Sequence, residues 1–528
     1  MSHTDPDTRT RAGDRSVFVI LLALYGVVLY PILRADRYYN DDLKRALIGR
    51  TGWDSNGRPL TTLLMKLLQC YDHALVDISP FTQLAAIAML AGIGVLIARR
   101  YAIRSPWLAA LVAFPLGAQP FYMENLSYKF DALSMSFAML FALVPVLVLG
   151  QGRRAGWLGV LALFVSLNFY QPAINVYLMF VLLEFAMAQL RDQAPRDLWK
   201  QLAVRAGQFL VSMAIYEIIV GIHVNGWVKR KSVTIHHLSD LPQVGRNALE
   251  FARHILHAFN TQWWLYFGPA LLALAVIAVA AALGYARRQR ALRSTRMNAA
   301  LVAAALLLPV AALLCVPGPM LVLLDPLLAP RVLIGVGALL SAALILMQGA
   351  LRCWCFSERW TIALSSLFAL GMCVFASAYG NALGEQKCYE DRIATRLADD
   401  LAALPTRAVL LDGSPGMAPI TRHIGEQFPL MRELVPSYIG GSDLFHTHIF
   451  LLYYIEDFDD IRLNTDAAAQ HRNAALIERS CSATPVSTTS HYTLYVLDDV
   501  AVVRMGAQEQ RCGNDTAAPL AQPSGGIK

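Results

Sequence analysis

VFVILLALYGVVLYPILRADRYYNDDLKRALIGRTGWDSNGRPLTTLLMKLL, residues 17–68, separates sharply into an apolar part and a polar part. The apolar part, 17–33, is long enough to cross a hydrocarbon core of about 30 Å as a helix. The polar part, 34–68, is too hydrophilic to cross a bilayer and too regularly patterned to be a random linker. The sequence therefore predicts a retained membrane helix followed by a structured external loop.

The composition extends this prediction to most of the chain. Of 528 residues, 56% are hydrophobic and 16% are charged, and the mean hydropathy is +0.44. A soluble protein carries about 25% charged residues, so a soluble enzyme is excluded. Further apolar runs are centred near residues 90, 113, 140, 163, 182, 216, 275, 307, 341 and 369. We expect an α-helical polytopic membrane protein with about eleven spans, in which Tyr170, Gln171 and Pro172 mark either a boundary between two spans or a broken helix.

The charges predict the orientation and the partners. Residues 1–379 carry a net charge of +14 and residues 380–528 carry −7. A basic membrane part suits lipid head groups or phosphate-bearing substrates, and an acidic tail argues against nucleic acid as a partner. Most positive charges of the short loops fall on one side if the head, 1–16, is cytoplasmic. These charges include Arg99, Arg100, Arg104, Arg153, Arg154, Arg191, Arg196, Arg287, Arg288 and Arg352.

An odd number of spans places the tail outside the cytoplasm. Its composition changes at Gly380, and helical periodicity over 386–403 is followed by β-branched runs at 408–412, 492–497 and 500–505. These patterns predict a small α/β domain over residues 380–513 and a disordered end over 514–528. Cys481 and Cys512 bracket the strand-rich part and are either paired or free thiols.

Metal and cofactor motifs are not evident in the sequence. It holds no paired CxxC, Walker, GxGxxG or HExxH pattern, and His446 with His448 lacks further ligands, so no metal site or cofactor is predicted, although metal dependence stays open. Glu184 and Glu217 lie within apolar runs as two isolated acids without matched basic partners. They make only a thin case for an ion or proton path.

The pattern of the polar loop predicts two short amphipathic helices. The first begins at Asn40 or Asp41, and the second follows the turn at 55–57 with Pro59 at an early helical position. We expect one face of the second helix to lie on the bilayer surface, namely Leu60, Leu63, Leu64, Leu67 and Leu68. Neighbouring helical residues point about 100° apart, so at most one of Asp41 and Asp42 faces a given cavity. Alternatively, both only cap and solubilise the helix start.

Four motifs carry a family resemblance. NDDL at 40–43, TGWDSNGRPL at 51–60, ENLSYKFDALSM at 124–135 and NFYQPAIN at 168–175 follow in order, and LVPSYI at 434–439 extends the likeness into the tail. Together they resemble the type II glucosyltransferases of phage-borne serotype-conversion systems.

The resemblance implies a GT-C-like glycosyltransferase of the bacterial inner membrane. Its catalytic domain would be the transmembrane part, 17–379, including the external loop 34–80, and its active site and tail domain would be periplasmic. The donor would be undecaprenyl phosphate glucose, and the acceptor would be a sugar of the lipopolysaccharide O-antigen. An acidic residue of the first external loop is the proposed base in such enzymes, and this role falls on Asp41 or Asp42.

That chemistry gives a role to the remaining residue types. A sugar hydroxyl needs a base to accept its proton, and a single displacement inverts the anomeric centre, so one carboxylate suffices. The leaving phosphate needs positive charge, which arginine supplies bidentately. The candidate phosphate and sugar ligands are Asn56, Arg58, Tyr128, Lys129, Asp131, Tyr170, Gln171, Arg331 and, less directly, Trp53 and 229–231.

Simpler interpretations stay open for these residues. Basic side chains at a membrane edge often only reach for lipid head groups, and Asp131 could pair with Lys129 at the interface. Two other functions also stay open. One is a transporter or flippase for a polyprenyl-linked sugar, and the other is a GT-C enzyme that uses another sugar.

Overall fold

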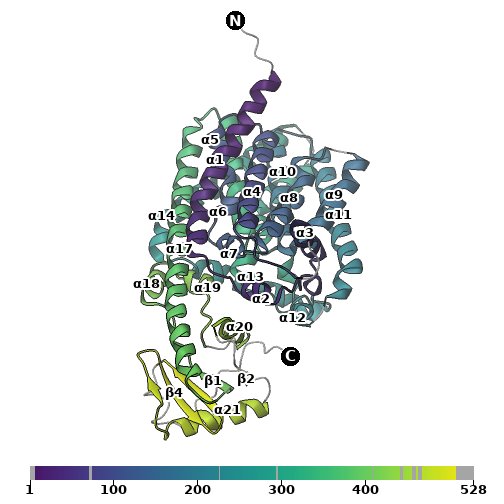
Figure 1. The fold of residues 1–528 in the computed structure, drawn as a ribbon. Helices are drawn as coiled ribbons and strands as arrows, with labels where there is room; N and C mark the ends of the chain where they lie inside the picture. The colour runs from purple at the N-terminus through teal and green to yellow at the C-terminus, as the bar shows by residue number, and fades with distance from the viewer. Residues whose placement is uncertain are drawn as a thin grey trace. The chain divides into compact units, whose positions relative to one another are not determined.

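The structure is a computed structural model that describes residues 6–70, 74–150, 152–224, 226–292, 295–406, 408–440, 444–454, 460–461 and 467–506. It is mostly helical, with one small sheet (Figure 1). The chain divides into two compact units, which we call the helical unit and the tail unit. The helical unit takes its residues from 1–34, 50–380 and 428–434, and the tail unit takes its residues from 35–49, 381–427 and 435–528.

The helical unit opens with α1 (Pro6–Ala35), so the predicted polar head is helical from Pro6 onward. Its other α-helices are α3 (Pro59–Gln69), α4 (Phe81–Arg100), α5 (Pro106–Ala113), α6 (Pro115–Ala118), α7 (Tyr122–Ser127), α8 (Ala132–Leu147), α9 (Arg153–Phe169), α10 (Ile174–Leu190), α11 (Pro195–Ile219), α12 (Gly226–Lys231), α13 (Leu241–His257), α14 (Thr261–Leu292), α15 (Thr295–Cys315), α16 (Gly335–Cys353), the first part of α17 (Arg359–Ala402), and α19 (Met431–Leu434). Its 3-10 helices are η1 (Asp54–Asn56), η2 (Gln171–Ala173), η3 (Gly221–His223), η4 (Leu238–Asp240), η5 (Gly318–Val322) and η6 (Pro330–Val332).

Seven helices of the described residues are long and apolar enough to cross a membrane. They cover Gly13–Ala35, Phe81–Arg100, Gln171–Leu190, Pro195–His223, Thr261–Arg288, Gly335–Cys353 and Arg359–Ala402. The other predicted span centres, near 113, 140, 163 and 307, fall on α5 and α6, α8, α9 and α15. The structure thus supports seven spans, and the total of about eleven stays a prediction. The helix is interrupted at Tyr170, because α9 ends at Phe169 and α10 begins at Ile174 after η2, and the choice between two spans and a broken helix stays a prediction.

The interior of the helical unit contains an unusual connection. α8 packs against α4 and α9, and α10 packs against α8 and α16. Between α6 and α8 the chain forms only the short helix α7 and a turn, yet residues 108–135 are buried almost without exception. This buried connection, 119–131, carries Glu124, Lys129 and Asp131. Buried charges must be paired, so their partners identify the polar centre of the unit.

The two short helices of the external loop begin as predicted. α2 (Asp41–Ile48) starts at Asp41, and α3 starts at Pro59, whose missing N–H suits the first helical position. α3 contacts α9, and its buried residues are Thr61, Thr62 and Met65. Leu63 and Leu67 remain exposed, as a face that lies on a bilayer requires.

The tail unit combines the end of α17 with a five-stranded sheet of order β2-β1-β5-β4-β3. Its strands are β1 (Ala408–Asp412), β2 (Asp460–Ile461), β3 (Ser487–Thr488), β4 (Tyr492–Leu497) and β5 (Val500–Met505). Its helices are α2, the second part of α17, α18 (Pro419–Gln427), α20 (Leu444–Tyr454) and α21 (Ala467–Ser480). β5 pairs parallel with β1 and antiparallel with β4. The three predicted strand runs therefore form the centre of this sheet.

α2 belongs to the tail unit although it lies early in the chain. Leu43 of α2 is buried in one hydrophobic cluster with Ile393 and Leu397 of α17 and with Val503 of β5. α2 also contacts α20. The segment 35–49, which carries Asp41 and Asp42, therefore folds with the C-terminal part of the chain.

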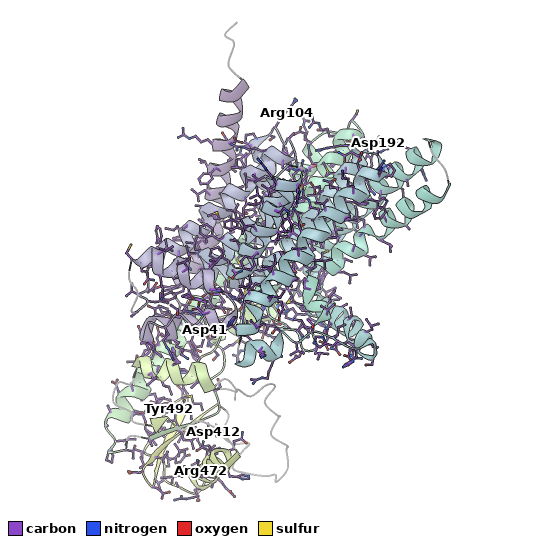
Figure 2. All side chains as sticks on the ribbon, turned by 90° about the vertical axis from the view of Figure 1, so that its right-hand side faces the viewer. Asp41, Arg104, Asp192, Asp412, Arg472 and Tyr492 are labelled. Carbon is purple, nitrogen blue, oxygen red and sulfur yellow. The ribbon has the colours of Figure 1, made fainter. Side chains whose placement is uncertain are left out.

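One end of the helical unit is basic. α4 ends at Arg100 and α10 ends at Leu190, and Figure 2 shows Arg104 and Asp192, which follow these helices, at the same end of the unit. Glu184 of α10 is buried beside this end. Its carboxylate pairs with Arg100 at 2.9 Å and with Arg205 of α11 at 2.8 Å. The expectation that Glu184 lacks basic partners is wrong, because its partners lie far away in the sequence.

Several expectations involve residues that the structure does not describe. Cys481 is disulfide-bonded, but its predicted partner Cys512 lies outside the described residues, as does the end 514–528. His446 and His448 fall on the helix α20 instead of a strand, and their side chains lie outside the described ones.

Candidate active site

The loop before α3 is held inside the helical unit by Trp53. This side chain is fully buried, and its Nε1 donates a hydrogen bond to Oδ1 of Asp131 at 2.8 Å. The Trp53 carbonyl accepts the backbone N–H groups of Asn56 and Arg58. Trp53 is thus a buried anchor and not a platform for stacking on a sugar. It fixes the turn that presents Arg58.

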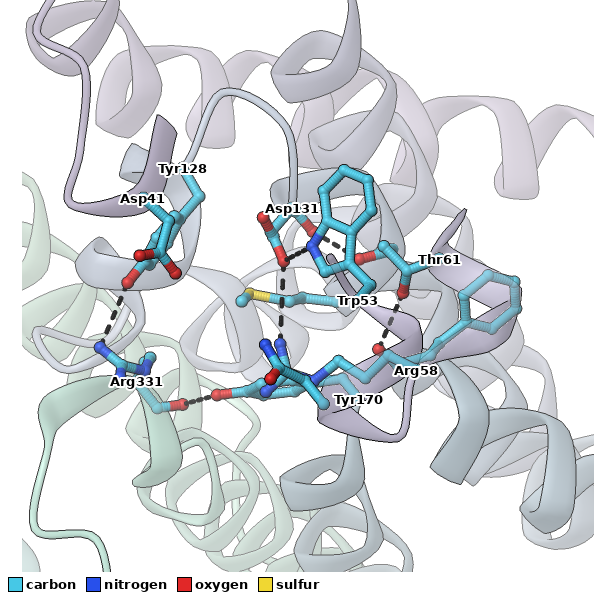
Figure 3. Close-up of polar contacts among 12 residues, drawn as sticks. Asp41, Trp53, Arg58, Thr61, Tyr128, Asp131, Tyr170 and Arg331 are labelled. Atoms are coloured by element: carbon cyan, nitrogen blue, oxygen red, sulfur yellow. Dashed lines mark hydrogen bonds and ion pairs between the residues drawn. The ribbon is translucent and has the colours of Figure 1, made fainter. Parts of the chain in front are cut away.

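Arg58 contacts residues at the start of α8 and at the break between α9 and α10, which are distant from it in the sequence. Its Nε donates to Oε1 of Gln171 at 3.1 Å, and its Nη1 lies 3.7 Å from Oδ1 of Asp131. The guanidinium carbon lies 4.6 Å from the centroid of the Tyr170 ring, a cation–π arrangement. These contacts join the loop to the break between α9 and α10 (Figure 3).

Gly57 is required at this turn. Its φ is +72°, and a Cβ there would collide with the hydroxyl of Tyr216. That hydroxyl donates to the Gly57 carbonyl at 2.9 Å and accepts from Nε2 of Gln171 at 2.8 Å. Gln171 also donates to the backbone carbonyl of Asn56 at 3.1 Å. The predicted residue Asn56 therefore takes part through its backbone.

Arg331 forms the second half of the site. Its Nη1 donates to Oε1 of Glu124 at 2.6 Å and to the Tyr128 hydroxyl at 3.2 Å, and its backbone N–H donates to Oε2 of Glu124 at 2.7 Å. Its carbonyl accepts from the Tyr170 hydroxyl at 2.8 Å and from Nδ2 of Asn125 at 3.4 Å. Tyr170 therefore connects the Arg58 group with the Arg331 group, as Figure 3 shows.

The two carboxylates of this cluster balance the charges of its two guanidinium groups, but the arginine side chains remain partly exposed. Glu124 and Asp131 are buried, whereas the side chains of Arg58 and Arg331 are 20% and 26% exposed. Among the described residues, Nε and Nη2 of Arg331 have no hydrogen-bond partner. The carboxylates orient the two guanidinium groups while further N–H donors remain available to a ligand.

Tyr170 acts as a neutral donor at the centre of the cluster. Burial raises the pKa of its hydroxyl to about 12, and the nearby guanidinium of Arg58 only partly offsets this rise. The hydroxyl therefore keeps its proton at neutral pH. It serves to fix the Arg331 carbonyl and does not act as a base.

Lys129 forms an ion pair with Asp77. Its side chain is 7% exposed, and its Nζ lies 3.4 Å from Oδ2 of Asp77. Thr82 of α4 donates to the Lys129 carbonyl, and Gln83 donates to the Leu126 carbonyl at 2.9 Å. The start of α4 thus holds the buried connection that carries Glu124 and Asp131.

The two predicted base candidates differ in exposure. Asp42 is fully buried, whereas the side chain of Asp41 is 52% exposed, with Arg45 at 3.8 Å. Asn40 occupies the N-cap position of α2, but its side chain does not accept the capping hydrogen bond. Both aspartates belong to the tail unit, whereas Arg58, Tyr170 and Arg331 belong to the helical unit.

The structure brings together most of the predicted ligands. Asn56, Arg58, Tyr128, Asp131, Tyr170, Gln171 and Arg331 form one connected network in the helical unit. Lys129 lies beside this network in the chain, and Lys231 of the basic run pairs instead with Asp325. Sequence reasoning gave no pairing role to Asp77, Glu124 or Tyr216, since each is an ordinary interfacial or helical residue when its partner is unknown.

The apolar helices and this cluster indicate a membrane protein with two partly exposed guanidinium groups suited to an anionic ligand. The family model for glucosyl transferase GtrII matches residues 30–342, and the chain belongs to this family of serotype-conversion glucosyltransferases. A protein of Salmonella phage P22, described as a 55.3 kDa protein in the gtrB 5′ region, is 25% identical over 442 residues, which are 82% of this chain and 88% of that protein. No solved structure matches the chain.

The matched range contains the whole cluster. It runs from the end of α1 into α16 and includes Trp53, Arg58, Glu124, Tyr170 and Arg331. The protein is a membrane-bound glucosyltransferase of O-antigen serotype conversion, and its family implies a lipid-linked sugar donor and a polysaccharide acceptor.

Proposed function

We propose that the protein transfers glucose from undecaprenyl phosphate glucose to a sugar of the O-antigen, with inversion, on the periplasmic face of the inner membrane. A GT-C-like arrangement of the helical unit underlies this function. The observation that carries the proposal is the pair of partly exposed arginines, Arg58 and Arg331, each oriented by a buried carboxylate.

The reaction is a single displacement. A hydroxyl oxygen of the acceptor forms a bond to the anomeric carbon of glucose, the bond from that carbon to the phosphate oxygen breaks, and the hydroxyl proton passes to a carboxylate. Undecaprenyl phosphate leaves with the bonding electrons. Because its phosphate is stable as an anion, the leaving group needs cationic donors and no proton.

Arg331 is the principal phosphate ligand in this proposal. Glu124 and Tyr128 hold one edge of its guanidinium, and the other edge offers Nε and Nη2 to two phosphate oxygens. Arg58, fixed on Tyr170 and Gln171, adds a second positive charge. Both groups are in place before the donor binds, so little reorganisation opposes the departure of the phosphate.

Asp41 is the base in this proposal, and Asp42 has a structural role. An acceptor can reach the exposed carboxylate of Asp41 but cannot reach the fully buried Asp42. Within the helical unit, the half-buried Gln171 offers an amide that can contact the glucose hydroxyls, while Tyr128 and Asp131 orient Arg331 and Arg58 beside it. The choice of glucose over another hexose depends on such contacts, because one unmatched buried hydrogen bond strongly disfavours the wrong sugar.

The charge distribution supports the proposed periplasmic location. The start of α4 contacts the buried connection at Leu126 and Lys129, and the other end of α4 carries Arg99, Arg100 and, soon after, Arg104. Lys and Arg concentrate on the cytoplasmic side of membrane proteins. This distribution supports placing the cluster at the periplasmic end of the helical unit.

The test is transfer by the purified protein in lipid nanodiscs. Labelled undecaprenyl phosphate glucose and O-antigen should give glucosylated product whose anomeric configuration, read by NMR, is opposite to that of the donor. Asp41→Asn should lower the rate by about 10²- to 10⁴-fold. Asp192→Asn is the matched control, because this exposed residue lies at the basic end and pairs with Arg288.

Each outcome addresses one part of the proposal. If the wild-type protein yields no product from this donor but does from another polyprenyl-linked sugar, the donor assignment is wrong. If Asp41→Asn works at the wild-type rate, the base assignment is wrong. If the anomeric configuration is retained, the single displacement is wrong.

A further inference from the structure

The residues directly before α2 have a strained backbone. Asn40 has φ +46° and ψ −109°, and Asp36 has φ +42°, both in the left-handed region that non-glycine residues rarely adopt. Such conformations cost on the order of 1–3 kcal/mol each and persist only where the surroundings hold them. Asp41 directly follows Asn40, so whatever holds this turn also sets the direction of Asp41.

Tyr438 of the tail unit braces the turn. The Tyr438 hydroxyl accepts the backbone N–H of Asn40 at 2.7 Å and donates to the carbonyl of Tyr38 at 2.9 Å. Tyr438 is itself buried, and burial raises the pKa of its hydroxyl well above its usual value, so the group remains a donor. The Tyr438 hydroxyl thereby links two backbone groups of the turn, the Tyr38 carbonyl and the Asn40 N–H.

A buried ion pair fixes Tyr438 in turn. The guanidinium of Arg37 lies 4.6 Å from the Tyr438 ring centroid and pairs with Oε2 of Glu390 at 2.6 Å. Oε1 of Glu390 accepts the N–H of Tyr438 at 2.8 Å and the hydroxyl of Ser437 at 3.0 Å. Arg37 also donates to the carbonyl of Pro436 at 2.6 Å. The segment 436–438 and the segment 37–40 are thus joined by direct hydrogen bonds.

We infer that Tyr438 is a positioning residue, whose hydroxyl holds the strained turn at Asn40 and thereby aims the Asp41 carboxylate. This inference rests on the proposed function of Asp41 as the base. It also gives Tyr438 a role in the reaction for which its own side chain needs no contact with the donor or the acceptor. Removing only the hydroxyl should let the turn relax, and a base displaced by about 1 Å can lose about 10²-fold in rate.

Two substitutions of equal size separate positioning from general stability. Tyr438→Phe removes the bracing hydroxyl. Tyr492→Phe is the matched control, because Tyr492 belongs to the same hydrophobic cluster and its hydroxyl donates to Asp400 of α17 at 2.8 Å. Tyr438→Phe should lower kcat by about 10- to 100-fold with an unchanged KM for the donor. Tyr492→Phe should keep the wild-type kcat.

Hydrogen–deuterium exchange of the full-length protein in nanodiscs supplies a readout without catalysis. Peptides covering 36–45 should exchange faster in Tyr438→Phe than in Tyr492→Phe. Equal exchange in the two variants, or a wild-type kcat for Tyr438→Phe, overturns the inference. Because no substrate is present, exchange tests the brace even if Asp41 proves not to be the base.

A double variant tests whether the effect passes through Asp41. If it does, Tyr438→Phe should cause no further loss of kcat in an Asp41→Asn background. Multiplying losses would show that Tyr438 acts elsewhere and would overturn the inference. A fully active Asp41→Asn protein is a different result, since it would reject the proposed base.

Discussion

Arg331 shows how a charged side chain can be held by a buried carboxylate and still serve a ligand. Glu124 lies 207 positions earlier in the chain, and its two oxygens bind both the backbone N–H and Nη1 of Arg331. A buried carboxylate with such a partner costs less to desolvate than an isolated one. The pair is therefore a rigid support for the remaining N–H donors of the guanidinium, and geometry as well as charge should matter at this position.

Arg331→Lys tests the importance of this geometry. Lysine keeps the charge but cannot bind Glu124 and a phosphate through two parallel edges, so we expect kcat/KM for the lipid donor to fall by at least about tenfold. Arg104→Lys makes the same change at an exposed position after α4 and should leave kcat/KM unaltered. Steady-state transfer in nanodiscs measures both variants. Full activity of Arg331→Lys would contradict the role of Arg331 as a bidentate ligand.

The helix α3 has one buried face and one exposed face. Met65, Thr61 and Thr62 are buried and the helix packs against α9, whereas Leu63 and Leu67 are exposed. Threonines on the buried face and leucines on the exposed face are the reverse of a soluble amphipathic helix. This inversion is expected where the exposed face meets lipid.

An environment-sensitive fluorophore can test the lipid contact of α3. Attached at Leu67→Cys in a variant with no other cysteine, the probe should emit at shorter wavelength in nanodiscs and be quenched by brominated lipids. The same probe at Ser55→Cys, an exposed position of the preceding turn, should report water. A water-like spectrum at position 67 would contradict the placement of this face on the bilayer.

Glu184 ties three helices together at the basic end. Its two buried oxygens bind Arg100 of α4 and Arg205 of α11, so Glu184→Gln leaves two guanidinium groups without their counter-charge. We expect a loss of about 3–5 kcal/mol in the free energy of unfolding. Glu217→Gln, at an exposed position of α11, should change it by less than about 0.5 kcal/mol. Unfolding in mild detergent measures both, and equal stabilities would contradict the network.

Local patterns predicted the elements better than the partners. The starts of α2 and α3 followed from Asn40, the turn at 55–57 and Pro59, because caps and prolines act within one helical turn. Three strand runs were predicted at the positions of β1, β4 and β5. The pairs Glu124–Arg331 and Glu184–Arg100 were not, since hydropathy and periodicity carry no information on contacts between distant segments.

The candidate site was predicted in part for the same reason. The motif residues Arg58, Tyr170 and Gln171 do meet in one network, as the order of the motifs suggested. The folding of 35–49 with the C-terminal part of the chain could not be predicted, because it depends on contacts between distant segments, such as the hydrogen bond from Asn40 to Tyr438 and the burial of Leu43. Such assignments require the tertiary structure.

One long helix, α17, contributes residues to both units. α17 has 44 residues and is about 66 Å long at 1.5 Å per residue, more than twice the hydrocarbon thickness. It begins in the helical unit and continues past Gly380 into the tail unit. Its two ends therefore lie on opposite sides of the membrane if its apolar part spans the bilayer.

Native cysteines can verify this topology. Cys353 and Cys355 precede α17, Cys388 lies within its second part, and all three are exposed. In single-cysteine variants, a membrane-impermeant maleimide applied to spheroplasts should label Cys388 at once. It should reach Cys353 or Cys355 only after permeabilisation. The opposite pattern would place the tail in the cytoplasm and contradict the periplasmic location.

The triad of Glu184, Arg100 and Arg205 also bears on how the chain enters the bilayer during synthesis. A lone ionised glutamate near a helix end is costly in lipid, and its partner Arg205 emerges from the ribosome only 21 residues later. Insertion of α10 and α11 as a neutralised hairpin against the already inserted α4 avoids that cost. Because Arg205 follows Glu184 so closely in the sequence, the ionised carboxylate would not have to enter the hydrocarbon core without its partner.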